Sequence, residues 1–261
     1  MMPRRSKKLR VGILFGGRSA EHEVSVVSAQ GVMAALDHDR FQPVPMGVTR
    51  QGTWLTPSQT EQALQRIRAE RLRSLDEPLG EGILHRTQVF SALRRIDIVF
   101  PLIHGTNGED GTLQGFLELA GVPYVGAGVA ASALGMDKAL QKTIFRQQGI
   151  PLADDVVITS SMWRSDPGGV RLGVEATISY PCFVKPANGG SSIGTSKVRS
   201  QEDLETALLE AFRYDRKALV EKAVEGRQVE TAVLGNDEPE ASPVGEITFQ
   251  GEFYDYHAKY D

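Results

Sequence analysis

The sequence predicts an α/β fold in its first half and an α+β fold in its second half. In the first half, short apolar runs alternate with segments whose apolar residues recur at helical spacing, and the links between them are short. Strand–helix–strand order of this kind is typical of a parallel sheet covered by helices. In the second half, short apolar runs dominate. The pattern changes near Gly126.

The expected elements begin with a short apolar strand. Residues 11–15 (Val-Gly-Ile-Leu-Phe) form this run, and Gly16-Gly17 ends it as a turn. Apolar residues then recur at helical spacing from Val24 to Leu36, which predicts a helix, and residues 44–48 form a second strand. Residues 58–75 are polar and arginine-rich with leucines interspersed, which indicates a surface helix with solvated charges.

One further helix between two strands closes the first half. Residues 96–100 form the next apolar run. Apolar residues at i, i+3, i+4 and i+7 between Leu113 and Ala120 predict a helix, and Gly121 ends it as a C-cap. Residues 122–125 are expected to start another strand.

The second half begins with a small-residue segment, 126–133, which indicates a domain junction. A helix is expected from about Lys138 to Gly149. The polar segment 160–177 is expected to be a loop, and Ser200-x-x-Asp203 is a capping-box variant that opens a helix. Strands are expected at residues 156–158, 182–185, 218–221, 229–234 and 244–249.

Composition excludes several classes of protein. The 261 residues are 41% hydrophobic and carry 29 Lys and Arg against 33 Asp and Glu, a net charge of −4. This composition argues against global disorder and against a basic nucleic-acid-binding protein. Cys182 is the single cysteine, so no internal disulfide is possible, and no apolar run has the length of a membrane span. We expect a cytoplasmic protein without nucleic-acid or membrane partners, because the basic start lacks a signal-peptide core.

The stretch Phe15–Glu23 is the first candidate site. A strand, a glycine turn and a helix start present backbone N–H groups to an anion or a carboxylate, and Glu21 lies near the first helical turn. The spacing is not G-x-G-x-x-G, so the dinucleotide fingerprint is not met. The alternative is that Glu21 only complements the helix dipole.

The stretch Pro101–Gly111 is the second candidate. It follows a strand and precedes a helix, and ligands of parallel α/β sheets lie beyond the carboxyl ends of strands. His104 could therefore face a ligand. The alternative is a structural histidine in a turn that caps the helix.

Residues 183–194 are the third candidate. Lys185 ends an apolar strand, and the Gly/Ser loop after it offers the N–H and hydroxyl groups of a phosphate cradle. The spacing is not that of a P-loop, and a flexible hairpin turn is the alternative. A fourth stretch, 218–226, is a strand ending in Glu221-Lys222, which an edge strand with solvated charges would also explain.

Metal and hydrolase signatures do not occur in the sequence. The five histidines do not cluster, and H-E-x-x-H, a cysteine pair and G-x-S-x-G are missing.

Taken in order, these stretches resemble the D-alanine–D-alanine ligase family of the ATP-grasp superfamily. The resemblance covers nearly the whole chain, and it rests on the joint order of the motifs because none of them is decisive alone. The matching residues are Phe15–Glu23, His104–Gly111, Gly135–Lys138, Lys185–Gly194, Glu221-Lys222 with Gly226, and Phe253–Tyr260.

The resemblance implies a Rossmann-like parallel α/β domain followed by an ATP-grasp fold whose C-terminal part is incomplete. The implied domains are an N-terminal substrate domain at 1–126, a central ATP-grasp subdomain at 127–222 and the start of the C-terminal subdomain at 223–261. The implied reaction is ATP-dependent ligation of two D-alanines through an acyl phosphate, for peptidoglycan synthesis. A homodimer in the cytoplasm is also implied.

The resemblance also assigns roles to residues. Glu21, Ser191 and Tyr260 are similar to a hydrogen-bonded catalytic cluster that holds the first D-alanine, and His104 is similar to a neighbour of the substrate carboxylate. The residues similar to ATP contacts are Lys138, Lys185, Gly190, Ser191, Ser192, Glu221, Lys222, Val224, Gln228 and Lys259.

Two departures from the family pattern affect these expectations. Gln228 stands where many relatives carry an acidic ribose contact, so nucleotide affinity is expected to be weaker at most. The family's metal ligands, with two Mg²⁺ (or Mn²⁺) ions, and an arginine lie beyond the matched residues. No metal ligand is therefore expected in this chain, and we expect the chain, ending at Asp261, to be inactive or nearly so.

Other functions compete with this interpretation. A D-alanine–D-lactate ligase is one, although relatives of that kind tend to replace the tyrosine matched by Tyr260. A nucleotide-binding fragment without catalysis is another. A Rossmann-type oxidoreductase is disfavoured because its glycine fingerprint is missing.

Overall fold

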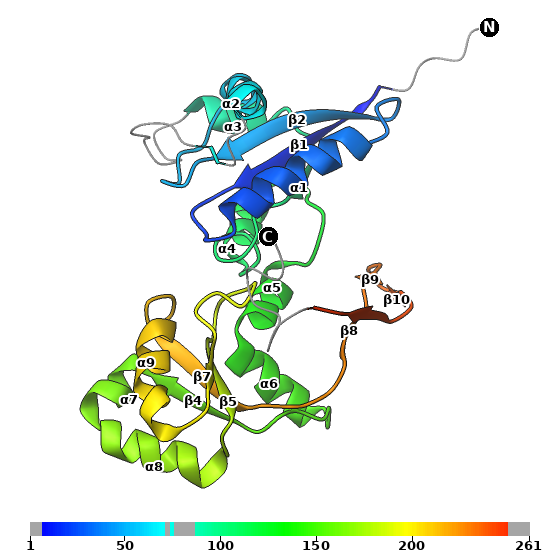
Figure 1. The fold of residues 1–261 in the computed structure, drawn as a ribbon. Coiled ribbons are helices and arrows are strands. Elements are labelled where there is room, and N and C mark those ends of the chain that lie inside the picture. The colour runs from blue at the N-terminus through cyan, green and yellow to red at the C-terminus, as the bar shows by residue number, and fades with distance from the viewer. Residues whose placement is uncertain (1–6, 71–73, 76–86, 250–261) are drawn as a thin grey trace, which may run out of the picture. The chain divides into compact units, whose positions relative to one another are not determined.

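The structure, a computed structural model of the chain, describes residues 7–70, 74–75 and 87–249 (Figure 1). The chain forms two compact units. The first comprises residues 1–144 together with 188–190, and the second comprises residues 145–187 and 191–261. The domain boundaries expected at 126 and 222 remain predictions, since compactness alone does not define them.

The first unit is built on a parallel sheet, as predicted. β1 (Leu9–Gly16), β2 (Phe41–Val48) and β3 (Ile98–Pro101) lie in the order β2-β1-β3. Gly12 of β1 is opposite Val44 on one side and Val99 on the other. The residues that follow β1 and β3 therefore emerge at the same edge of the sheet, where ligands of parallel sheets bind.

Apolar residues of β1 serve two cores because successive side chains point to opposite faces. Ile13 and Phe15 are completely buried in a cluster that includes Val26 and Ala29 of the first helix. Leu14 belongs to the other cluster, with Leu117 of a later helix.

The helices of the first unit confirm most of the sequence pattern. The helix expected at 58–75 is observed at 57–70 and buries its few apolar residues, while residues 71–73 lie outside the described part. Gly121 has φ 64° and ends its helix as predicted. The helices are α1 (His22–Ala35), α2 (Pro57–Glu70), α3 (Thr87–Leu93), α4 (Thr112–Ala120), α5 (Val129–Met136) and α6 (Lys138–Gln147).

The expectation of a strand at residues 122–125 is wrong. Residues 122–125 form only an isolated parallel bridge, in which the Val99 N–H donates to the Pro123 carbonyl (2.8 Å). Pro123 has no N–H, so it cannot extend a ladder. The segment 126–133 contains the start of α5, and its role as a domain junction stays a prediction.

The second unit contains an antiparallel sheet covered by helices. β4 (Asp155–Thr159), β7 (Lys217–Lys222), β5 (Cys182–Pro186) and β6 (Ser196–Val198) lie in the order β4-β7-β5-β6. Its core joins Val184 and Val220 of the sheet to Leu204 and Leu208 of α9 (Gln201–Ala211).

The loop expected at 160–177 is in fact two helices, α7 (Ser160–Ser165) and α8 (Pro167–Thr177). Thr159 accepts a hydrogen bond from the Met162 N–H, and Asp166 accepts one from the Gly169 N–H. These polar N-caps and Pro167 in the first turn read as loop signals in the sequence, but they are helix starts.

The last described segment forms two small antiparallel pairs. β8 (Gln228–Glu230) pairs with β11 (Gly245–Ile247), and β9 (Val233–Leu234) pairs with β10 (Glu240–Ala241). The strand expected at 229–234 is thus divided between two pairs.

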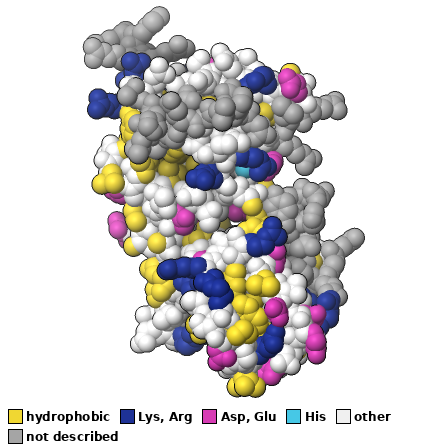
Figure 2. Space-filling view, turned by 90° about the vertical axis from the view of Figure 1, so that its left-hand side faces the viewer, with side chains coloured by type: hydrophobic (Ala, Val, Ile, Leu, Met, Phe, Trp, Pro, Cys, Tyr) yellow, Lys and Arg dark blue, Asp and Glu magenta, His cyan; other side chains and the backbone are white. Residues whose placement is uncertain are grey.

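The surface in Figure 2 has basic and acidic side chains interspersed among apolar ones. None of the helices in the described ranges combines the length and the apolar character that crossing a bilayer requires.

Candidate active site

Glu21 lies in the turn between β1 and α1, and the side chains of Ser25 and His22 hold this turn. Gly16 and Gly17 have φ values of 90° and 94°, which let the chain reverse after the strand. Ser25 accepts a hydrogen bond from the Gly16 N–H (2.7 Å), and His22 Nδ1 lies 2.7 Å from the Gly17 carbonyl oxygen. His22 is therefore a buried structural residue, and Glu21, only 6% exposed, is fixed beside it.

The Glu21 carboxylate lies against two glycines. A Cβ atom added to Gly105 would be 2.5 Å from Glu21 Oε2, and one added to Gly190 would be 3.1 Å from it. The contacts bring together three stretches that are far apart in the sequence, all within the first unit. Glycine at both positions leaves room for the carboxylate.

His104 follows β3 and pairs with Glu109 in the same loop. His104 Nδ1 lies 3.8 Å from Glu109 Oε1, and Nε2 lies 3.3 Å from the hydroxyl oxygen of Ser28 on α1. The side-chain interaction with Glu109 raises the pKa of His104 above its usual value, burial opposes this, and the charges of Glu109 and Glu21 add to it. These interactions favour the charged imidazolium.

The pKa of Glu109 moves in the opposite direction. Burial would raise the pKa of this carboxyl, but His104 and the backbone N–H of Gly105, which donates to Oε2 at 2.7 Å, outweigh it and lower the pKa. Both shifts favour a charged pair. Sequence reasoning treated Glu109 only as half of an acidic pair before a helix; its five-residue separation from His104 across a glycine turn was the available signal.

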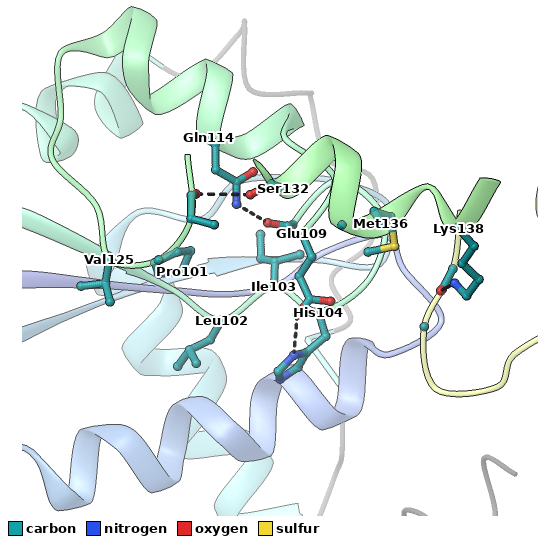
Figure 3. A pocket seen from close by; sticks show the side chains of 16 residues that line it. Pro101, Leu102, Ile103, His104, Glu109, Gln114, Val125, Ser132, Met136 and Lys138 are labelled. Atoms are coloured by element: carbon teal, nitrogen blue, oxygen red, sulfur yellow. Dashed lines mark hydrogen bonds and ion pairs between the residues drawn. The ribbon is translucent and has the colours of Figure 1, made fainter. Parts of the chain in front are cut away.

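The first unit has a pocket of about 510 Å³ beside the His104–Glu109 pair (Figure 3). His104 and Glu109 line it together with Lys138 and Gly190, while Leu102 and Met136 are among its apolar walls. Its volume is within the range of small-molecule sites.

Lys138 is held at the start of α6. Asp137 caps that helix, since its Oδ1 accepts hydrogen bonds from the Ala139 and Leu140 N–H groups (3.1 Å each). The Lys138 Nζ donates to the Gly189 carbonyl oxygen at 2.5 Å, within the first unit. The ammonium is thereby fixed at the pocket.

Lys185 and Glu221 form a second charged group, in the second unit. Lys185 Nζ on β5 lies 2.6 Å from Glu221 Oε2 on β7, and their side chains are 25% and 18% exposed. Antiparallel pairing of the two strands holds both side chains in place. A partly buried ion pair of this kind holds the Lys185 ammonium in a fixed place beside Glu221.

The loop that follows β5 has an unusual backbone. Ser191 and Ser192 have φ values of 48° and 58°, and Gly194 has φ 69°. Left-handed conformations are costly for non-glycine residues and cluster at ligand clamps and switch regions. Consecutive N–H groups in such turns can form anion-binding concavities.

The remaining predicted site residues lie at strand ends, in an exposed linker or outside the described residues. Lys222 ends β7, Val224 is 74% exposed in the following linker, and Gln228 begins β8. Lys259 and Tyr260 lie outside the described residues. The structure thus gathers Glu21, His104, Lys138 and Gly190 in the first unit, and Lys185 with Glu221 in the second.

Within the described ranges, no three His, Cys, Asp or Glu side chains come close enough to hold a metal ion.

Comparisons with known proteins give one consistent result. A family model described as D-ala D-ala ligase N-terminus matches residues 10–127, and one described as D-ala D-ala ligase C-terminus matches residues 144–261. The chain is 44% identical to the D-alanine–D-alanine ligase of Geobacillus kaustophilus over 259 residues, which cover 97% of this chain and 71% of that protein. The chain is 45% identical to the D-alanine–D-alanine ligase of Bacillus licheniformis over 258 residues, which cover 97% of this chain and 72% of that protein.

Solved structures agree with the sequences. The VanG D-Ala:D-Ser ligase from Enterococcus faecalis superposes with a TM-score of 0.75 at 34% identity, covering 98% of this chain and 74% of that one. The D-alanine–D-alanine ligase from Coxiella burnetii superposes with a TM-score of 0.74 at 34% identity, covering 93% of this chain and 69% of that one. The resemblance found in the motifs is confirmed, and the chain belongs to the D-alanine–D-alanine ligase family.

Proposed function

We propose that the chain joins two D-alanine molecules to D-alanyl-D-alanine at the expense of ATP, for cell-wall synthesis. The observation that carries the proposal is the buried carboxylate of Glu21 in its glycine cradle, in the same unit as His104 and Lys138. A free amino acid carries an ammonium and a carboxylate, and one anion with neighbouring cations complements both charges.

The chemistry needs positioning and charge neutralisation. The γ-phosphoryl group of ATP passes to a carboxylate oxygen of the first D-alanine, and ADP leaves. The amine of the second D-alanine then attacks the acyl carbon, phosphate leaves with the C–O bond electrons, and the amine loses a proton. We assign the first ammonium to Glu21 and the carboxylate to the neighbourhood of His104, which places the reacting oxygen for transfer.

We assign ATP to Lys138, Lys185 and the loop that follows β5. Lys138 and Lys185 supply point charges for phosphate oxygens, and the left-handed turn at Ser191 and Ser192 supplies N–H groups. The proposed set of ATP residues also includes Gly190, Glu221, Lys222, Val224, Gln228 and Lys259. Ser191 and Tyr260 complete the proposed catalytic cluster with Glu21.

We further propose that Mg²⁺ or Mn²⁺ accompanies ATP, because phosphoryl transfer ordinarily uses a cation that bridges phosphate oxygens. A homodimer and a cytoplasmic location are also proposals, and they rest on the family alone.

The deciding experiment is D-alanine-dependent phosphate release from Mg-ATP by the 261-residue chain, with L-alanine as the control. Release with D-alanine alone supports the proposal. A folded chain that binds ATP but releases no phosphate would overturn catalysis by this chain. It would instead agree with the inactivity expected from the sequence and favour the nucleotide-binding alternative. Preference for D-lactate as the second substrate would favour a D-alanine–D-lactate ligase.

We expect Lys185→Met to weaken ATP binding by about tenfold or more, because a charge-assisted contact to phosphate is lost. Isothermal titration of the chain with ATP measures this effect. Lys197→Met is the matched control, since Lys197 lies on the neighbouring strand opposite Phe183. Equal ATP affinity in Lys185→Met and in the unaltered chain would remove Lys185 from the proposed site.

A further inference from the structure

The loop that carries His104 is braced at three points. The Glu109 carboxylate accepts from the Gly105 N–H (2.7 Å), Asp110 accepts from the Asn107 N–H (2.8 Å), and Gln114 donates to the Gly108 carbonyl oxygen (2.9 Å). The contacts of Asp110 and Gln114 fix only the backbone of the loop. Glu109 differs because its second oxygen faces the His104 imidazole.

The pair lies in the pocket rather than at a distance from it. Both His104 and Glu109 line the cavity, and Lys138 lies on the same lining (Figure 3). The His104 side chain is 28% exposed and that of Glu109 is 53% exposed, so the histidine is the more enclosed member. The charged groups that act on the imidazole are Glu109, at 3.8 Å, and Glu21.

We infer that Glu109 is a positioning residue that acts through His104: it orients the imidazole on the pocket wall and keeps it positively charged for the carboxylate of an amino-acid substrate. Glu109 lies at Nδ1 and the Ser28 hydroxyl lies at Nε2, so each ring nitrogen faces an oxygen that can accept a hydrogen bond, and both N–H groups of an imidazolium donate. The inference deepens the proposed function and rests on it for the identity of the substrate.

The direction of the pH dependence follows from the two pKa shifts. The raised pKa of His104 means that its favourable charge is fully present below its unfolded pKa and is lost as pH rises through the raised value. The lowered pKa of Glu109 means that its contribution is present above its unfolded pKa and is lost as pH falls through the lowered value. The pair is therefore intact between mildly acidic pH and the raised pKa of His104.

The first test follows the imidazole itself. NMR titration of the histidine-labelled full chain, with His104 assigned through His104→Gln, gives its titration midpoint. We expect a lower midpoint in Glu109→Gln, whose amide oxygen can still accept from the Gly105 N–H. Glu109→Asp, which keeps the charge, should lie closer to the unaltered chain. Asp110→Asn is the matched control, since it removes a carboxylate of the same loop that braces only backbone.

The second test follows substrate. In Glu109→Gln, KM for D-alanine should rise by about tenfold at a pH above the lowered midpoint, with kcat changed less. In a chain that already carries His104→Gln, adding Glu109→Gln should not change how KM for D-alanine depends on pH.

Each outcome decides the inference. An unchanged His104 midpoint in Glu109→Gln, an equal shift in Asp110→Asn, or an added pH effect without His104 would overturn it. Absence of phosphate release would remove the proposed function, but the NMR midpoints would still show whether Glu109 controls the charge of His104.

Discussion

We expect Glu21→Gln to lower kcat/KM for D-alanine by about 100-fold or more, equivalent to about 3 kcal/mol. The carboxylate is 6% exposed and lies against Gly105 and Gly190. Because the amide has nearly the same shape but no charge, it fits the cradle and loses the ion pair with a substrate ammonium. Steady-state phosphate release measures the effect, and calorimetric titration with D-alanine measures binding separately.

Glu23→Gln is the matched control for this change. Glu23 lies two residues later in α1 and forms an ion pair with Arg50, and its side chain is 27% exposed. Removing an exposed pair changes stability by only about 0–1 kcal/mol and leaves the pocket unaltered. If Glu23→Gln and Glu21→Gln reduced activity equally, the special role of Glu21 would be wrong.

The second large effect is expected for Gly105→Ala. Gly105 has φ 68°, and a Cβ atom there would be 2.5 Å from Glu21 Oε2. An alanine is strained in this conformation, which lowers the free energy of unfolding by about 1–3 kcal/mol, and the added methyl group displaces the carboxylate. Urea unfolding measures the first effect and D-alanine-dependent phosphate release measures the second.

Gly115→Ala in α4 is the matched control for Gly105→Ala, because the added methyl group meets no neighbour there. Gly115 lies inside α4, and an added Cβ would meet nothing within 4 Å. Alanine is favoured over glycine in a helix interior, so the free energy of unfolding should rise by about 0.5–1 kcal/mol with activity unchanged. Stabilisation by Gly105→Ala, or equal changes at both positions, would contradict this account of the glycine cradle.

Strands with strong local signals were predictable. Residues 11–15 lie inside β1 as expected, because a short apolar run that ends at two glycines fits a buried strand better than a helix. The segment 160–177 was not predictable in this way. Its capping residues Thr159 and Asp166 favour turns as well as helix starts, and packing of Trp163 and Val174 in the core of the second unit selects the helices.

Part of the candidate site was predictable, because its residues follow the ends of neighbouring parallel strands. Glu21 and His104 follow parallel neighbours β1 and β3, so their proximity at one sheet edge is a consequence of topology. Glu109 was missed as a partner of His104. Its approach depends on the left-handed turn at Gly105 and Asn107, which the residue pattern does not specify.

By itself, the sequence determined the alternation of strands and helices, the parallel sheet of the first half and, through the joint order of its motifs, the family. These properties depend on residue type and spacing along the chain. Only the tertiary structure decided that glycines 105 and 190 enclose the Glu21 carboxylate and that Glu109 faces His104. Such contacts join residues far apart in the chain or depend on backbone angles within one turn, so they are set by close packing after the chain has folded.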